Sequence, residues 1–230
     1  MKIYPVVHIT TVKTSVAEGI AALDAGADGI FLINHNGGPD KIFQTMKAIR
    51  TERPGSFVGV NLLEYTTKAA FDLIESKLTD KDYLPQALWV DDVTYSGRGS
   101  WEVYCDKNRH PDLCNIQLFG GIAFKYTSTF TEDPTLAAQE VISLRNDVDV
   151  VTTSGAGTGT APTVAKLHAV KQAAGDKPVA VASGISIENI VDIAHSVDFV
   201  LISTSIETHP GSGIFNKEKL NAVIEVAHSI

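Results

Sequence analysis

The stretch "PVAVASGISIENIVDIAHSVDFVLISTSI", residues 178–206, contains the unit from which the fold is built. Two short apolar runs, 178–183 and 198–203, each end in small polar residues, and the residues between them repeat with helical spacing. Continuous apolar runs rich in valine and isoleucine are typical of strands buried on both faces of a parallel sheet. The stretch therefore predicts a strand, a helix and a second strand parallel to the first.

The same alternation continues along the whole chain. Between the apolar runs, apolar residues recur at i, i+3, i+4 and i+7, the spacing of one helix face. Ile187, Ile190, Val191 and Ala194 form one such stripe. Eight candidate strands result, at 3–9, 29–34, 57–63, 87–92, 116–124, 148–154, 178–183 and 198–203.

Two proline-containing pairs mark expected helix starts. These are "DP" at 133–134 and "AP" at 161–162. Proline is favoured in the first helical turn, because its missing N–H has no helical partner there. We therefore expect a helix to begin at each pair.

Eight strand–helix units in 230 residues favour a single (β/α)8 barrel over residues 1–230. A doubly wound open sheet is the alternative, since it uses the same alternation. The count of eight and the final helix favour the barrel. The irregular segment 93–114 is interpreted as a loop over the barrel mouth.

The amino-acid composition limits which binding partners are expected. A net charge of −8 and a pI near 5.3 argue against non-specific binding to nucleic acid or to an anionic membrane surface. No window of 18 uninterrupted apolar residues occurs, so no transmembrane helix is expected. The two cysteines and the absence of a signal-like N-terminus predict a cytoplasmic protein. We also expect a homo-oligomer.

Small residues at three neighbouring strand ends predict an anion site. In a barrel, function gathers at the carboxyl ends of the strands, and phosphate often binds after the last strands. Small side chains let backbone N–H groups approach an anion, although a flexible turn is the alternative for a glycine cluster alone. The sequence predicts a phosphate site at the ends of the sixth to eighth strands, with these substrate-binding residues: Thr153, Gly155, Gly157, Ser183, Gly184, Ser203 and Thr204.

Ionisable and amide side chains at the other strand ends are candidates for chemistry. Lys125 is a Schiff-base amine, a charge stabiliser, a partner of an aspartate, or a solvated loop lysine. Strand alternation sends one of Asp91 and Asp92 inward. His8 is an acid or base near neutral pH, or a hydrogen-bonded core histidine. We predict Lys125, Asp91 and His8 as catalytic residues.

Amide side chains of two further strands are predicted to contact the substrate. Asn34 closes the second candidate strand and Asn61 lies in the third. No cofactor or metal site is predicted. The spacing of Cys105, His110 and Cys114 fits no usual zinc pattern. A magnesium ion held through water by Asp91 and Asp92 is a weaker alternative.

Several blocks together resemble the BtpA-like family. They are "ALDAGADGIFLIN" with "NGGP", "VGVNLLEYTTKAA", "GIAFKYTS", "VTTSGAGTGTAPTVAKLHAVKQA", "VASGISIENI" and "DFVLISTSIE". The resemblance implies a (β/α)8 barrel of the ribulose-phosphate-binding kind and a small phosphorylated ligand. It also implies two settings for the family, since one branch is associated with photosystem I biogenesis and others lie among sugar-metabolism genes.

The chain departs from that family pattern at two acidic positions. Ile33 stands before Asn34, and Gly121 stands four residues before Lys125, where the resemblance leads us to expect acids. The N-terminal turn is also reduced to "VHITTVKT". We expect phosphate binding to survive these changes, while chemistry that depends on the missing acids, including a metal role, does not follow. The chain is therefore interpreted as a divergent member.

Two functions follow as hypotheses. The first is an enzyme that carries out isomerase-, aldolase- or lyase-like proton transfer on a phosphosugar or phosphoribosyl compound. Lys125 and Asp91 would form the catalytic pair, with His8 and Asn61 orienting the substrate. The second is a non-catalytic assembly or regulatory protein that retains the phosphate site as a sensor.

Overall fold

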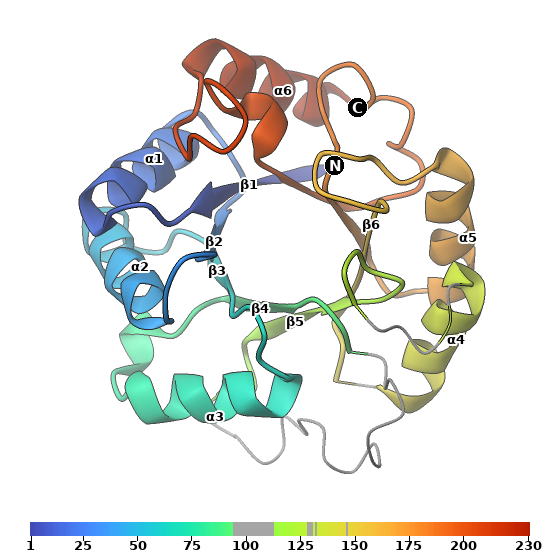
Figure 1. The fold of residues 1–230 in the computed structure, drawn as a ribbon, viewed down its shortest axis with the longest axis horizontal. Helices are drawn as coiled ribbons and strands as arrows, with labels where there is room; N and C mark the ends of the chain where they lie inside the picture. Colours follow the sequence, from blue (N-terminus) through green and yellow to red (C-terminus); the bar gives the residue numbers. More distant parts are fainter. Residues whose placement is uncertain (94–112, 128–130, 132, 146) are drawn as a thin grey trace.

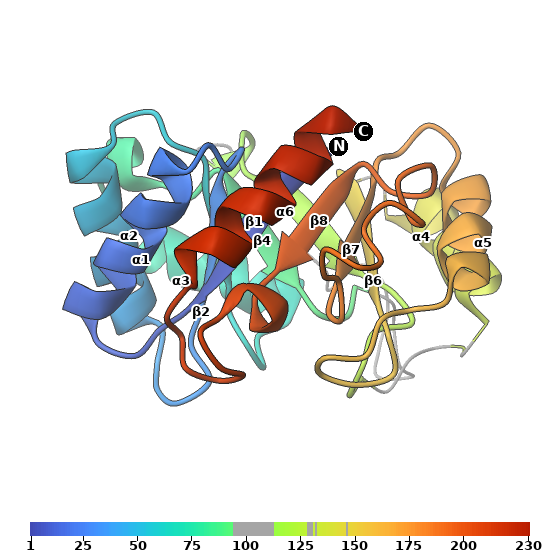
Figure 2. The ribbon, with the colours of Figure 1, turned by 90° about the horizontal axis from the view of Figure 1, so that it is seen from above.

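A computed structural model of the chain describes residues 1–93, 113–127, 131, 133–145 and 147–230. Eight parallel strands close into a barrel in chain order, with the helices on its outside (Figure 1). The side view shows the strands tilted inside the helical layer (Figure 2). The (β/α)8 prediction is confirmed. The strands are β1 Lys2–His8, β2 Ile30–Ile33, β3 Val58–Asn61, β4 Ala87–Val90, β5 Gln117–Gly121, β6 Val150–Ser154, β7 Val179–Ala182 and β8 Phe199–Ile202.

The helices follow the strands. The first residues of two helices test the helix starts that were predicted from proline. Asp133 caps the helix that begins at Pro134, as the "DP" pair predicts. The "AP" prediction is wrong by two residues, because the hydroxyl of Thr163 caps α5 and Pro162 lies before the cap. The helices are α1 Val12–Asp24, α2 Asp40–Glu52, α3 Thr67–Lys77, η1 Lys81–Tyr83, α4 Pro134–Leu144, α5 Val164–Ala174, η5 Thr204–Ile206 and α6 Lys217–Ser229.

The segment between β7 and β8 is a series of turns, so the helix predicted there is wrong. Ile187 and Val191 are 45% and 57% exposed, whereas Ile190 is buried. The Asn189 side chain accepts from the N–H of Ser186 and donates to the carbonyl of Gly184. Such side-chain bonds to nearby backbone compete with helical hydrogen bonds.

Alternation along the strands divides the core into two clusters. One set of side chains packs outward against the helices, and the other fills the barrel. The interior is aromatic near its amino-terminal end, where Tyr4, Phe31 and Phe119 pack edge to face. These rings fill the barrel at the amino-terminal ends of the strands. Space for a ligand is therefore left at the carboxyl ends.

Three expectations are not tested by this structure. Most of the predicted mouth loop, 94–112, lies outside the described residues. The homo-oligomer and the cytoplasmic location stay predictions. Within the described part of the chain, no helix has the length and hydropathy to cross a membrane.

Candidate active site at the barrel mouth

A cavity of about 1560 Å³ opens at the carboxyl ends of the strands. Its side chains follow the two-residue period of the strands. On four strands an apolar lining residue is followed two positions later by a polar one, which lies roughly 6–7 Å further along the strand. We call the apolar layer the floor and the polar layer the rim; the pairs are Val6 and His8, Ile33 and His35, Trp89 and Asp91, and Leu201 and Ser203.

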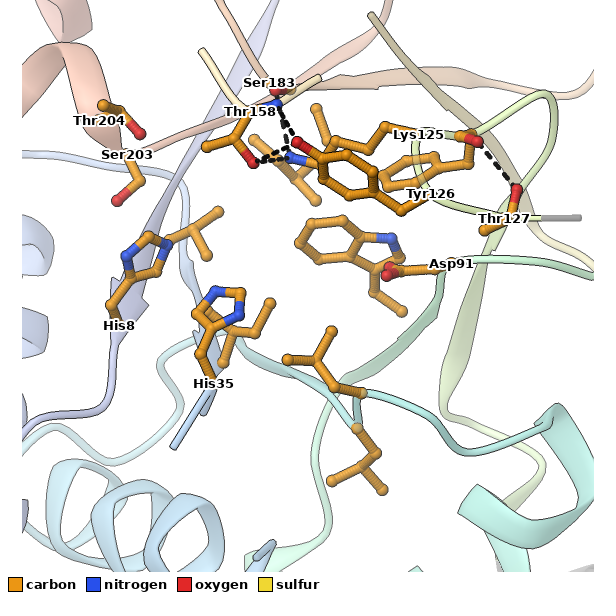
Figure 3. Close-up of a pocket in the computed structure, with 18 of the residues that line it drawn as sticks. His8, His35, Asp91, Lys125, Tyr126, Thr127, Thr158, Ser183, Ser203 and Thr204 are labelled. Atoms are coloured by element: carbon orange, nitrogen blue, oxygen red, sulfur yellow. Dashed lines mark hydrogen bonds between the residues drawn. The ribbon is translucent and has the colours of Figure 1, made fainter. Parts of the chain in front are cut away.

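Lys125 extends its ammonium into a group of hydroxyls on one side of the cavity (Figure 3). Its Nζ donates to Ser183 Oγ at 3.2 Å and to Thr158 Oγ1 at 3.4 Å. Burial lowers the pKa of this lysine, against attraction from Asp91. Among the described residues, no carboxylate lies within 4.0 Å of the ammonium. Within the described ranges, the site therefore holds a positive charge without an ion-pair partner.

The loop that carries Lys125 is fixed by buried contacts. The N–H of Lys125 donates to Ser154 Oγ at 2.8 Å. From α5, Lys166 Nζ donates to the carbonyls of Ala123 and Ser154, both at 2.7 Å. These bonds join the loop after β5 to the end of β6, so they hold the base of the Lys125 side chain in place.

Asp91 lies across the cavity from the two histidines (Figure 3). Its Oδ1 accepts from Asn61 Nδ2 at 2.9 Å, which accounts for the buried amide of β3. Burial raises the pKa of Asp91, while Asn61 and Lys125 act in the opposite direction. The negative charge of Asp92 contributes to a raised pKa of Glu140 on α4. Both Asp91 and Asp92 line the cavity, and Asp91 is the member of the predicted pair that is bonded to Asn61 in the mouth.

His8 is paired with a fully buried carboxylate. Its Nδ1 lies 3.5 Å from Glu207 Oε1, and Glu207 has an exposed fraction of 0%. Ser203 Oγ and the N–H of Gly211 donate to this carboxylate at 3.0 and 2.7 Å. The His8 and His35 rings pack edge to face at 5.1 Å. Burial lowers the pKa of His8, while Glu207 raises it, so the neutral ring is favoured.

The loops after β6 and β7 contact each other at glycine. A Cβ on Gly184, whose φ is +71°, would lie 2.0 Å from the N of Ala161. The preceding Ser183 also has a positive φ of +87° and donates through Oγ to the carbonyl of Gly157 at 3.0 Å. At position 184, only glycine fits both the positive φ and the close approach to Ala161. The small residues therefore bring two loops together beside Lys125.

The predicted site residues divide into two groups. Those that line the cavity are Lys125, Asp91, His8, Ser183, Gly184, Ser203 and Thr204. Asn34, Asn61, Thr153, Gly155 and Gly157 do not line it.

Each of the polar residues that do not line the cavity forms a hydrogen bond within the protein instead. Asn34 Nδ2 donates to the carbonyl of Gly38 at 3.0 Å, and the Thr153 hydroxyl donates to that of Ile122 at 3.1 Å. Asn61 donates to Asp91. These residues support the mouth from behind, so direct substrate contact by them stays a prediction.

The structure shows the surroundings of Ile33 and Gly121, the two positions at which the resemblance led us to expect acids. Ile33 is part of the apolar floor. A Cβ on Gly121 would lie 2.0 Å from the carbonyl oxygen of Asp91. The glycine therefore allows β5 to pass close to the end of β4.

The predicted site residues did not include His35, Glu207, Thr158 and Tyr126. The Tyr126 hydroxyl accepts from the N–H of Thr158 at 3.1 Å, beside Lys125. His35 follows a strand end, which was an available signal. Glu207 lies beyond η5, and nothing local indicates that its partner is in β1.

The metal predictions remain open. Across the described ranges, no group of three or more histidine, cysteine, aspartate or glutamate side chains is placed to hold a metal ion. Cys105 and His110 lie outside the described residues, and Cys114 is exposed. The magnesium alternative at Asp91 and Asp92 is not tested.

The fold and the cavity define a (β/α)8 barrel with a site at its mouth, and solved structures share that fold. Phosphoribosyl anthranilate isomerase from Thermus thermophilus is 17% identical with a TM-score of 0.67, over 100% of this chain and 99% of that one. (S)-3-O-geranylgeranylglyceryl phosphate synthase from Thermoplasma acidophilum, solved with sn-glycerol-1-phosphate, is 13% identical with a TM-score of 0.64, over 100% and 94%. A 3-hexulose-6-phosphate synthase is 15% identical with a TM-score of 0.64, over 97% and 100%.

A family model identifies the chain more closely. The model of the BtpA family matches residues 9–229, so the chain belongs to the BtpA family. The resemblance inferred from the sequence blocks is confirmed. No curated protein matches the chain significantly.

Proposed function

We propose that this chain is an enzyme that binds a small phosphorylated metabolite of the phosphosugar or phosphoribosyl type and moves a proton on it. One observation carries the proposal. The Lys125 ammonium is half-buried among hydroxyls, without a carboxylate partner in the described part of the chain. A desolvated charge of this kind is costly unless an opposite charge joins it, and a phosphate supplies that charge.

The phosphate is proposed to lie between Lys125 and the loops after β7 and β8. Ser183, Ser203 and Thr204 line this side of the cavity. Hydroxyls and backbone N–H groups are suited to phosphate oxygens, and in (β/α)8 barrels phosphates commonly bind after the seventh and eighth strands. The names of the three solved enzymes above, or of the compound bound to them, refer to phosphorylated molecules, which supports the same ligand class by analogy of fold.

The chemistry is proposed for the opposite part of the rim. Burial raises the pKa of Asp91 towards neutrality, and burial lowers the pKa of His8, which favours the neutral ring that can accept a proton. Groups with such pKa values are suited to general acid–base catalysis. In an isomerase- or lyase-like step, one group removes a proton from a carbon beside a carbonyl and the other protonates the oxygen. Lys125 stabilises the anionic end of the substrate throughout.

Binding tests the phosphate site directly. Ribose 5-phosphate and sn-glycerol-1-phosphate are titrated by calorimetry against the native protein, Lys125→Met and Lys68→Met. Lys68 also lines the cavity but pairs with Asp72, which makes it the matched control. We expect Lys125→Met to weaken binding about tenfold to hundredfold, the range for a charged hydrogen bond. Absence of binding to every phosphorylated compound would contradict the proposal.

Proton transfer separates the enzyme from the non-catalytic alternative. A ketose phosphate that binds is incubated with the protein in deuterium oxide, and deuterium at the carbon beside the carbonyl is followed by NMR. We expect incorporation by the native protein and a loss of at least hundredfold in Asp91→Asn. Tight binding without exchange or turnover would favour the assembly or regulatory function instead.

A further inference from the structure

The cavity is larger than the proposed ligand class requires. Small-molecule sites typically enclose about 300–1,000 Å³, and this one encloses about 1560 Å³. A five-carbon sugar phosphate beside Lys125 leaves much of that volume to be filled. The side chains that line the remaining space therefore indicate what else the ligand contains.

The additional space extends over the end of β3 and the start of α3. Leu63, Tyr65 and Ala69 line it, and all three are half-buried, so their surfaces are accessible. The amide of Asn61 is already bonded to Asp91 and does not line the cavity. Polar side chains line the same sector as well, namely those of Glu64, Thr66, Lys68 and Asp72. The apolar part of this sector is therefore the face formed by Leu63, Tyr65 and Ala69.

Aromatic side chains adjoin the same sector. Trp89 and Phe124 both line the cavity, with ring centroids 5.8 Å apart and planes at 66°. Leu63 packs against the cluster to which both belong. Aromatic surfaces favour flat apolar partners, which stack or meet them edge to face. A sugar hydroxyl placed against these apolar surfaces, away from the polar side chains of the sector, would lose water without gaining a hydrogen bond.

We propose that the ligand carries, besides its phosphate, an aromatic or similarly flat apolar group that lies against Leu63, Tyr65, Trp89 and Phe124. This inference rests on the proposed function, because the phosphate beside Lys125 fixes the orientation. In the closed order of eight strands, β3 lies opposite β7. The ligand therefore spans the mouth, with its anionic end at β7 and β8 and its apolar end at β3.

Three phosphate monoesters test the inference. Methyl phosphate provides the anion alone, ribose 5-phosphate adds a polar group, and phenyl phosphate adds a flat apolar group. Affinities are measured by calorimetry at constant ionic strength. We expect phenyl phosphate to bind at least tenfold more tightly than either of the others. In a Trp101→Phe variant, Trp89 is the one remaining tryptophan, and its fluorescence should change with phenyl phosphate.

A pair of leucine variants locates the apolar group. Leu63→Asn should reduce the ratio of phenyl phosphate to ribose 5-phosphate affinity to near one. Leu23→Asn is the control, since Leu23 is partly buried against the outer core and does not line the cavity. That variant should keep the ratio of the native protein.

The outcomes distinguish this inference from the proposed function. If ribose 5-phosphate binds as tightly as phenyl phosphate, or if Leu63→Asn keeps the preference, the inference is overturned and the phosphate site stands. If none of the three monoesters binds, the proposed function fails and the inference fails with it.

Discussion

The two sides of the barrel mouth are built differently. On the side of β6 to β8, small residues bring backbone segments into contact, and Lys125 lies against their hydroxyls. On the side of β1 to β4, ionisable groups are partly buried, and burial is the largest cause of each pKa shift. The first arrangement is suited to holding the proposed ligand in a fixed position. The second keeps proton-carrying groups poorly solvated, which costs stability and gives reactivity.

The largest effect is expected from a substitution that breaks the backbone contact on the side of β6 to β8. A side chain on Gly184 meets both a positive φ and the backbone of Ala161 at 2.0 Å, whereas Gly159 has a φ of +76° with open space around it. Gly159→Ala should cost about 1–2 kcal/mol from conformation alone. Gly184→Ala should cost about 1–3 kcal/mol more through the clash, and it should weaken ribose 5-phosphate binding at least tenfold.

Urea unfolding and calorimetry of both alanine variants check this prediction. Equal costs at the two glycines would mean that the loops after β6 and β7 separate freely. The contact would then not be needed for the anion site.

A smaller effect is expected from the carboxylate behind His8. Glu207→Gln replaces an acceptor of the Gly211 or Ser203 hydrogen bond with a donor, which should cost about 1–3 kcal/mol. The pKa of His8 should fall further, because Glu207 raises it in the native protein. A protonated His8 is disfavoured in the folded state. Stability should therefore decline as the pH falls below about 6.5, the ordinary histidine value, and more steeply in the variant.

NMR titration of His8 and unfolding at several pH values measure both effects. Glu188→Gln is the matched control, since Glu188 is exposed in the segment before β8. If the His8 pKa is unchanged in Glu207→Gln, the two side chains lie close together without an electrostatic interaction.

The smallest effect concerns the pH dependence of stability at Asp91. Its folded-state pKa is raised by burial, so its contribution to stability is present below the unfolded pKa and is lost as the pH rises through the folded pKa. Asp91→Asn should therefore be more stable than the native protein at pH 7, by less than the cost of Glu207→Gln. That advantage should shrink towards pH 4.

Unfolding of Asp91→Asn across this pH range tests the sign. Asp192→Asn, at an exposed position, serves as the control. An advantage that grows on acidification would mean that the carboxylate is stabilised in the folded protein.

Sequence reasoning predicted the two sides unequally. Ser183 and Gly184 were recognised because a strand that ends in small residues is a local pattern. Asp91 and Lys125 were found from strand ends in the same way. The Glu207 contact with His8 joins β1 to the segment after β8, across nearly the whole chain, so no local spacing indicates it.

Two other differences between expectation and structure have local causes. Thr153 and Asn34 are near strand ends, but their polar atoms bond to backbone carbonyls away from the cavity. Alternation decides this, and an error of one residue reverses the side. The helix expected at 187–194 failed because Asn189 bonds the backbone that a helix would use.

The close passage of Gly121 beside Asp91 has an evolutionary consequence. A single mutation cannot place an acid at position 121, because its first carbon would overlap the carbonyl of Asp91. An acidic residue at this position would first require the neighbouring strands to move apart. Such a substitution is thus deleterious until a second, permissive change is present. Ancestral-sequence reconstruction would look for that permissive change in β4 or β5.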